Sequence, residues 1–276
     1  MHDHARQSTP PPGSADRPEG VAAGLGGRDL GLGVDVGGSG VKGALVDLAT
    51  GELASERHRI DTPQPATPEA VAATITEIVD GFDWGGPVGV ALPSVVKNGV
   101  TRTAANIDAA WIGLDARAVL SSALGGRSVT LLNDADAAGL AEQQLGAGRD
   151  ARGLVMMLTF GTGIGSALLY NGVLVPNTEL GHLEVGGAEA EHRAAASVRE
   201  RTKMSWAEWS VEVTAVLRAY EALFAPDLFI VGGGVSKKAH KWLPLVEVAT
   251  PIVPAELRNT AGIVGAALAA RLDSAL

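Results

Sequence analysis

Short apolar runs alternate with amphipathic segments along most of the chain, which is typical of an α/β protein. The runs at 29–36, 87–93 and 128–132 have the length and branched side chains of buried strands. From Thr67 to Phe82 apolar residues instead recur at helical spacing, with Thr67 as the expected N-cap and Pro68 at the first helical position. The pattern therefore predicts helices interleaved with mixed sheets.

A glycine loop followed by a returning strand occurs twice in the chain. "DVGGSGVKGALVDL" and "FGTGIGSALLYNGVLV" both combine a glycine loop with a returning strand, and Gly161 lies 124 positions after Gly37 (161 minus 37). Such a duplication indicates two like domains facing each other across a cleft. We expect domains at 29–132 and 133–276, with the last helix, from Gly262 to about Leu272, packing back on the first domain.

Residues 1–28 are rich in proline, glycine and charged side chains. They offer too little apolar surface to offset the entropy of ordering them. We expect a disordered tail here.

The glycines after the first strand stand in the G-x-G-x-x-G register of a dinucleotide-binding loop. That motif needs a helix directly after it, and here a strand follows. The interpretation that remains is a phosphate-binding loop on a β-hairpin. A third glycine run follows the strand "DLFIVGGG". The candidate phosphate-binding residues are Gly37, Gly38, Ser39, Gly40, Gly161, Thr162, Gly163, Gly165, Gly233 and Gly234.

Two charged residues accompany the first loop. Asp35 ends the first strand, where its carboxylate could hold Mg²⁺ beside a phosphate chain or simply stabilise the turn. Lys42 could contact phosphate or be a solvated hairpin residue. The sequence leaves both alternatives open.

Polar residues that could bind and activate an alcohol follow other strands. Asn133 and Asp134 stand where a strand gives way to a helix, so that Asp134 could be an N-cap, a base accepting a hydroxyl proton, or both, since the two roles are compatible. Glu179 and His182 flank Gly181 after a hairpin and form a candidate site for a hydroxyl-rich ligand, with Asn106 as a weaker candidate.

The segment "SKKAHKW" is the densest positive cluster of the chain. Lys237 and Lys238 directly follow the third glycine loop, so a long polyanion is a possible ligand, although a solvated surface is the simpler interpretation.

Composition narrows the classes of partner. The net charge of −9 argues against a surface adapted to nucleic acid or to anionic membranes, and no run is apolar enough to span a bilayer. The absence of cysteine excludes disulfides and thiolate metal sites. A cytoplasmic location is the default expectation.

Taken together, "DVGGSGVKG", "LLNDADAAG", "TFGTGIGSALLYNG", "ELGH" and "VGGGVS" resemble the repressor, open-reading-frame and kinase (ROK) family of sugar kinases in motif and order. The resemblance covers nearly everything after the tail and implies an actin-like (ribonuclease H-like) ATPase fold. Many relatives carry a cysteine-rich zinc motif after the Gly-His pair, and this chain has none there. The zinc-free version, with "TPIVPAELRNTAGIVGAA", resembles the polyphosphate glucokinases of actinobacteria.

The resemblance implies roles for the candidate residues. Asp134 would accept the proton of the 6-hydroxyl of glucose, and Asn106, Asn133, Glu179 and His182 would hold the other hydroxyls. The glycine loops, Mg²⁺ and the lysines would bind polyphosphate or ATP. The family implies a homodimer, and the missing cysteines imply that no zinc is bound. The resemblance leaves open mannose as a second sugar and which of Glu184, Glu191 and Glu200 contacts sugar.

Two other functions remain as alternatives. A strictly ATP-dependent glucokinase or glucomannokinase would carry the same motifs. A sugar-sensing repressor needs a helix-turn-helix ahead of the first strand, and the 28 residues there are rich in proline and glycine. We therefore expect an enzyme.

Overall fold

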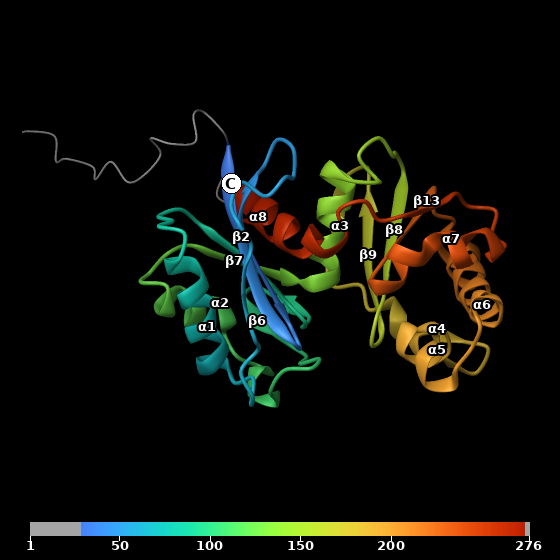
Figure 1. Ribbon diagram of the computed structural model, residues 1–276, viewed down its shortest axis with the longest axis horizontal. Helices are drawn as coiled ribbons and strands as arrows, with labels where there is room; N and C mark the ends of the chain where they lie inside the picture. The colour runs from blue at the N-terminus through green and yellow to red at the C-terminus, as the bar shows by residue number, and fades with distance from the viewer. Residues whose placement is uncertain (1–28, 274–276) are drawn as a thin grey trace, which may run out of the picture.

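Two five-stranded sheets stand side by side in the computed structural model, each covered by helices on its outer side (Figure 1). The structure describes residues 29–273, so the tail expected at 1–28 lies outside the described residues.

The first sheet has the order β3-β2-β1-β4-β7. β1, β2 and β3 are antiparallel neighbours, whereas β4 and β7 run parallel to β1. The strands are β1 (Leu30–Gly37), β2 (Gly40–Asp47), β3 (His58–Ile60), β4 (Val88–Leu92) and β7 (Val129–Asn133).

The second sheet repeats this arrangement as β10-β9-β8-β13-β14. Its first three strands are antiparallel, and β13 and β14 run parallel to β8. The strands are β8 (Leu154–Phe160), β9 (Ile164–Tyr170), β10 (Val173–Val175), β13 (Leu228–Gly232) and β14 (Ile252–Pro254). The duplication predicted from the glycine loops is confirmed.

Two helices form the layer between the sheets (Figure 1). α8 (Ala261–Asp273) packs on β1 and β4 of the first sheet, α3 (Asp134–Leu145) packs on β8 and β9 of the second, and the two helices pack on each other. The contact with the first sheet is close because small residues line it: a Cβ at Gly33 would lie 1.9 Å from the carbonyl oxygen of Ile263. Both domains are therefore joined through α3 and α8.

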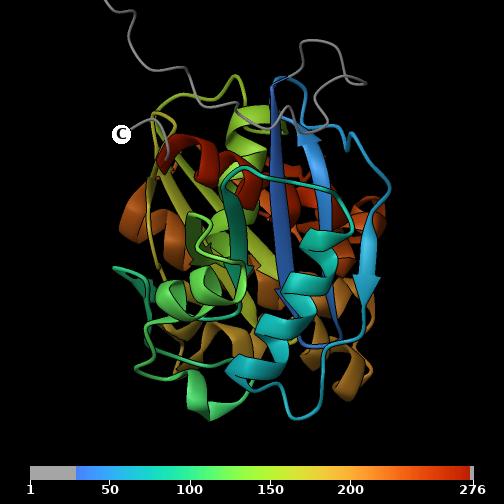
Figure 2. The ribbon, with the colours of Figure 1, turned by 90° about the vertical axis from the view of Figure 1, so that its left-hand side faces the viewer.

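The outer faces carry the remaining helices. α1 (Pro68–Asp80) and α2 (Ala116–Ala123) cover the first sheet (Figure 2), and the Thr67 hydroxyl accepts a hydrogen bond from the N–H of Ala70, which confirms the predicted cap. On the second sheet, α6 (Trp206–Phe224) and α7 (Ala239–Trp242) bury Trp209 and Trp242, whose rings lie 4.9 Å apart. Each domain thus has its own apolar core.

Short elements connect these layers. A short hairpin around Asn98 and Gly99 consists of β5 (Val96–Lys97) and β6 (Val100–Thr101). A second small hairpin is formed by β11 (Glu184–Val185) and β12 (Ala188–Glu189), before α4 (Ala190–Ala194) and α5 (Ala196–Thr202). The 3-10 helices are Ala109–Trp111, Leu180–His182, Gly234–Lys238, Leu243–Leu245 and Arg258–Thr260.

Candidate active site

Two cavities lie between the domains, and Asp134 lines both of them. The one that we call the central cavity, of about 570 Å³, is lined by Asn106, Asn133, Glu179 and His182 together with the second glycine loop. The one that we call the basic cavity, of about 410 Å³, is lined by Asp35, Lys42 and three arginines. Asp134 therefore stands where a polar, hydroxyl-binding space meets a cationic one.

The position of Asp134 follows from the end of β7. Asn133 is the last residue of β7 and the N-cap of α3, and its side-chain oxygen accepts hydrogen bonds from the N–H groups of Ala135 and Asp136. The interpretation of Asp134 as the N-cap is therefore wrong, because Asn133 takes that place and Asp134 is the first helical residue. Freed from capping, the Asp134 carboxylate is exposed to the two cavities.

The surroundings of Asp134 change its acidity. The walls of the cleft desolvate the carboxylate, and the negative charges of Asp35 and Glu179 act in the same direction, so that the pKa of Asp134 rises from 3.8 to about 6. A carboxylate with a pKa near 6 is ionised at neutral pH and is more basic than an ordinary aspartate. Such a group suits proton abstraction from an alcohol.

Glu179 and His182 come from the loop and 3-10 helix after β10. Burial raises the pKa of Glu179, although the nearby His182 lowers it in part. The loop is fixed by the Ser166 hydroxyl, which accepts a hydrogen bond from the N–H of Leu180. Asn106 reaches the same cavity from the other domain, with a left-handed backbone at φ 61°. Polar groups therefore converge on one space from both domains.

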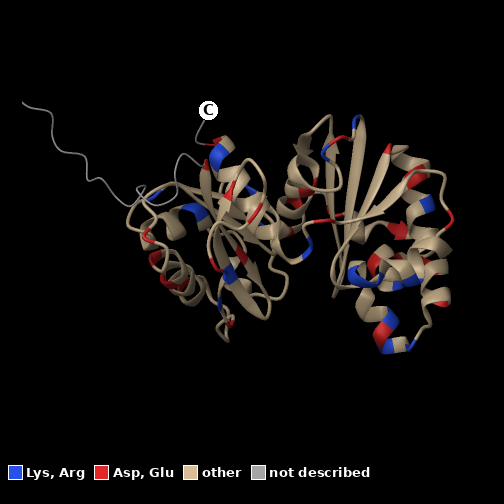
Figure 3. Cartoon of the chain, turned by 45° about the horizontal axis from the view of Figure 1, so that its top comes forward, with Lys and Arg blue, Asp and Glu red and all other residues tan. Residues whose placement is uncertain are grey.

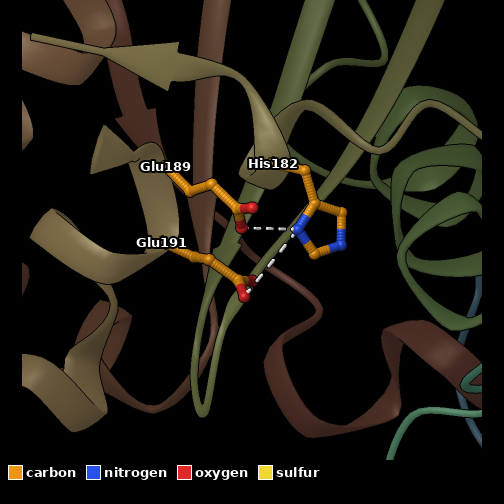
Figure 4. A group of neighbouring side chains, drawn as sticks. All are labelled: His182, Glu189 and Glu191. Carbon is orange, nitrogen blue, oxygen red and sulfur yellow. Dashed lines mark hydrogen bonds and ion pairs between the residues drawn. The ribbon is translucent and has the colours of Figure 1, made fainter. Parts of the chain in front are cut away.

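His182 is held by two carboxylates (Figure 4). Its Nδ1 lies 2.9 Å from Glu189 Oε2 and 3.9 Å from Glu191 Oε1, and the hydrogen bond with Glu189 raises the pKa of His182. Because Nδ1 is occupied, Nε2 is the nitrogen left for a ligand in the cavity. Among the three acids left open by the sequence, Glu191 lines the central cavity, whereas Glu184 and Glu200 are exposed outside it.

The second and third glycine loops line the two cavities. Gly161, Thr162, Gly163 and Gly165 line the central cavity, and Gly233 lines both. Gly233 has φ 82°, and a Cβ there would lie 2.2 Å from the carbonyl oxygen of Phe160, so only glycine fits. The two loops of the second domain therefore meet where the two cavities adjoin.

The first glycine loop lies beside the cavities. Gly37, Gly38, Ser39 and Gly40 line neither, but Gly38 packs on Asn106. Arg59 donates a hydrogen bond of 3.0 Å to the carbonyl oxygen of Ser39 and so ties the loop to β3.

Three residues predicted from the third loop lie outside both cavities. Gly234, Lys237 and Lys238 belong to the 3-10 helix that follows Gly233, and both lysines are exposed. Their predicted contact with phosphate remains a prediction.

Sequence reasoning missed several residues of the two cavities. Ser94 and Thr103 line the central cavity, and Ser94 accepts a hydrogen bond from the Asn133 amide through its carbonyl oxygen. Ser94 follows the carboxyl end of β4, where parallel strands commonly place binding residues, so its position was a usable signal. The three arginines of the basic cavity, Arg57, Arg59 and Arg258, have no motif in the sequence to mark them.

Two groups of residues could bind a cation. Asp35 lies against the basic cavity with Lys42 Nζ 3.4 Å from its carboxylate, and offers the hard oxygen ligand that Mg²⁺ prefers. The second group is His182, Glu189 and Glu191, whose ligand atoms lie within 4.8 Å of one another.

A third hollow, of about 770 Å³, lies away from this site. It is a shallow groove between α1 and α2 that contains alanines and the carboxylates of Glu69, Glu77 and Asp80. No candidate residue lies in it.

None of the helices that the structure describes has the length and apolarity needed to cross a bilayer.

Comparison with known proteins gives three findings. The model of the ROK family matches residues 31–196. A polyphosphate glucokinase of Mycobacterium tuberculosis is 61% identical over 244 residues, which cover 88% of this chain and 92% of that protein. The crystal structure of the inorganic polyphosphate/ATP-glucomannokinase from Arthrobacter sp. strain KM resembles this structure with a TM-score of 0.84. The two sequences are 50% identical, and the match covers 88% of this chain and 99% of that one.

A more distant structure shares the fold. A ROK family glucokinase from Streptomyces griseus, in complex with glucose and AMPPNP, has a TM-score of 0.75 at 24% identity and covers 88% of this chain and 99% of that one. The predicted actin-like α/β fold is thereby confirmed.

Proposed function

The chain belongs to the ROK family, and from that premise we propose that it transfers a phosphoryl group from inorganic polyphosphate to the 6-hydroxyl of glucose. The product is glucose 6-phosphate. The observation that carries this function is the position of Asp134, which stands between a cavity of hydroxyl-binding side chains and a cavity of cationic ones. The relative that is 61% identical, a polyphosphate glucokinase, supports the same donor and acceptor.

The reaction follows from this arrangement. Glucose binds in the central cavity through Asn106, Asn133, Glu179 and His182, with its 6-hydroxyl directed at Asp134. The Asp134 carboxylate accepts the hydroxyl proton while the oxygen attacks the terminal phosphorus in line. The bond from phosphorus to the bridging oxygen breaks, and the donor leaves one phosphate shorter.

Charge neutralisation is the second requirement of phosphoryl transfer. Asp35 would hold Mg²⁺, which withdraws electron density from the phosphate oxygens when it is bound. Lys42 and the N–H groups of the glycine loops would supply further positive charge and hydrogen bonds. We propose no zinc site. His182, Glu189 and Glu191 would instead orient one another toward the sugar.

The donor and the sugar can be tested in one experiment. We expect glucose 6-phosphate to form in a coupled assay with long-chain polyphosphate and Mg²⁺, more slowly with ATP, and at background rate in excess chelator. Turnover with ATP alone would identify the chain as an ATP-dependent glucokinase instead. Mannose in place of glucose tests the second acceptor that the name of the Arthrobacter neighbour suggests.

The oligomeric state of the protein is tested in a separate experiment. We propose that the protein is a homodimer in the cytoplasm. Light scattering after size-exclusion chromatography would give twice the 28.1 kDa of the chain for a dimer.

A further inference from the structure

The basic cavity reverses the charge balance of the chain. Lys42, Arg57, Arg59 and Arg258 line it, against two carboxylates, in a protein with 22 basic and 31 acidic residues. Elsewhere basic and acidic residues are interspersed over both domains (Figure 3). Cationic side chains around a cavity repel one another unless an anion binds there.

Two of the four cations already have partners. Lys42 pairs with Asp35, and Arg59 pairs with Asp61 at 2.7 Å and with the carbonyl oxygen of Ser39. The side chains of Arg57 and Arg258 form no hydrogen bond or ion pair with any other residue from 29 to 273. Their guanidinium groups are therefore free to bind an anionic ligand.

Arg258 is held in place from the helix that carries Asp134. The buried Glu142 of α3 accepts hydrogen bonds from the N–H of Leu257 at 2.7 Å and of Glu256 at 3.1 Å. Arg258 itself has φ 51°, a left-handed backbone that is unfavourable for a side chain of this size. Because Asp134 begins α3 and Glu142 lies in its last turn, one rigid helix sets both positions.

The two free arginines come from different domains. Arg57 directly precedes β3 of the first sheet, and Arg258 follows β14 of the second. A ligand that contacts both must span the space between the domains, beyond the point where Asp134 meets the acceptor hydroxyl. A polyphosphate fits this requirement because it carries charge along its whole length.

We propose that Arg57 and Arg258 bind the part of the polyphosphate chain that lies beyond the reacting phosphoryl group, one from each domain. This inference rests on the proposed function and names the residues that select a long polyanion over ATP. Guanidinium groups suit the role because they bind phosphate oxygens through paired hydrogen bonds.

The test compares two double variants. Arg57→Gln with Arg258→Gln removes both charges, and Arg117→Gln with Arg201→Gln removes two exposed charges outside both cavities. We expect the first to lower kcat/KM for long-chain polyphosphate about tenfold or more, mainly through KM, because charge-assisted hydrogen bonds are lost. The loss should be smaller for tripolyphosphate and for ATP. The control should behave as the wild type with all three donors.

A second readout does not depend on turnover. Long-chain polyphosphate should raise the Tm of the wild-type protein, and this rise should be smaller in the first variant and fall less steeply with added salt. Replacing both arginines by lysine should restore part of the effect. Equal losses with polyphosphate, tripolyphosphate and ATP would overturn the inference.

The two proposals fail in different ways. A wild-type protein that is stabilised by polyphosphate through these arginines but transfers no phosphoryl group from it would retain the site and lose the proposed function. A wild-type protein that uses polyphosphate, with a double variant that uses it equally well, would retain the function and exclude the arginines.

Discussion

At the scale of single residues, two neighbouring aspartates have different roles because their surroundings differ. Asp134 opens onto both cavities, whereas Asp136, two positions along α3, is 1% exposed. Burial of Asp136, more than any neighbouring charge, raises its pKa to about 7. One carboxylate faces the two cavities, and the other is enclosed by the protein.

We predict that Asp134→Asn abolishes turnover while glucose still binds. The amide keeps the shape of the side chain but cannot accept the hydroxyl proton. Calorimetric titration with glucose and the coupled assay measure the two effects separately. A variant with near-normal kcat would show that another group is the base.

The raised pKa of Asp134 also predicts a pH profile. Because the pKa is about 6, kcat/KM of the wild type should fall about tenfold for each pH unit below that value. A profile that stays flat down to pH 5 would contradict the assignment.

For Asp136 we predict an effect on stability. Its Oδ2 accepts a hydrogen bond of 2.7 Å from the N–H of Asn177, and its buried Oδ1 has no partner among the described residues. Since the pKa is raised on folding, the folded protein holds a proton that the unfolded chain releases, and stability falls between about pH 4 and pH 7.

Asp136→Asn keeps an acceptor for Asn177 and removes the charge. We expect the variant to exceed the wild type in free energy of unfolding by about 1–2 kcal/mol at pH 8, and by little at pH 4. Urea unfolding at both pH values measures the difference. A gain that is the same at both would exclude titration of Asp136 as its cause.

At the scale of elements, the two similar hairpins differ in where their glycine loops lie relative to the central cavity. Both antiparallel hairpins have the same strand order, yet the second glycine loop lines the central cavity and the first lies beside it. Arg59 donates a hydrogen bond to the carbonyl oxygen of Ser39 in the first loop, and Asn106 lies against Gly38. Repeated sequence thus produced two similar hairpins with unequal access to the site.

The lysines after the third loop belong to this scale. We predict that neutralising Lys237, Lys238 and Lys241 together weakens the use of long-chain polyphosphate more than the use of ATP. All three are exposed and attract a polyanion through charge, so the difference should shrink at high salt. Steady-state kinetics with both donors at low and high ionic strength measure it. Equal losses with the two donors would leave the cluster without a donor-specific role.

At the scale of the whole molecule, the junction of the domains is a pair of helices in close contact. A Cβ at Gly265 of α8 would lie 1.8 Å from the carbonyl oxygen of Ala137 in α3. Ala137 lies one turn after Asp134, so the same contact places the proposed base relative to the first domain.

We predict that Gly265→Ala separates α3 from α8. Overpacking of this kind costs about 1–3 kcal/mol of unfolding free energy, and it should also lower kcat because the two cavities shift relative to each other. Thermal unfolding and the coupled assay test both effects. Gly113→Ala, at a glycine whose added Cβ meets nothing within 4 Å but whose φ is 82°, controls for the backbone cost alone.

Much of this molecule could be predicted from its sequence, because local chemistry decides it. Alternating apolar runs located the strands, Thr67 and Pro68 began a helix, and glycine loops at strand ends indicated two like domains. That Asn133, Asp134, Glu179 and His182 line one cavity could be predicted because each stands at the end of a strand or hairpin, where side chains reach a cleft.

Other features are decided only by the tertiary structure, because they depend on contacts between residues far apart in the chain. The structure shows that Asn133, and not Asp134, caps α3. It also shows that Glu191 lines the central cavity, unlike Glu184 and Glu200, and that Arg57 and Arg258 line the same cavity. No local pattern encodes these pairings, because an arginine ahead of β3 and an arginine in the 3-10 helix after β14 line one cavity only when α3 and α8 join the two sheets.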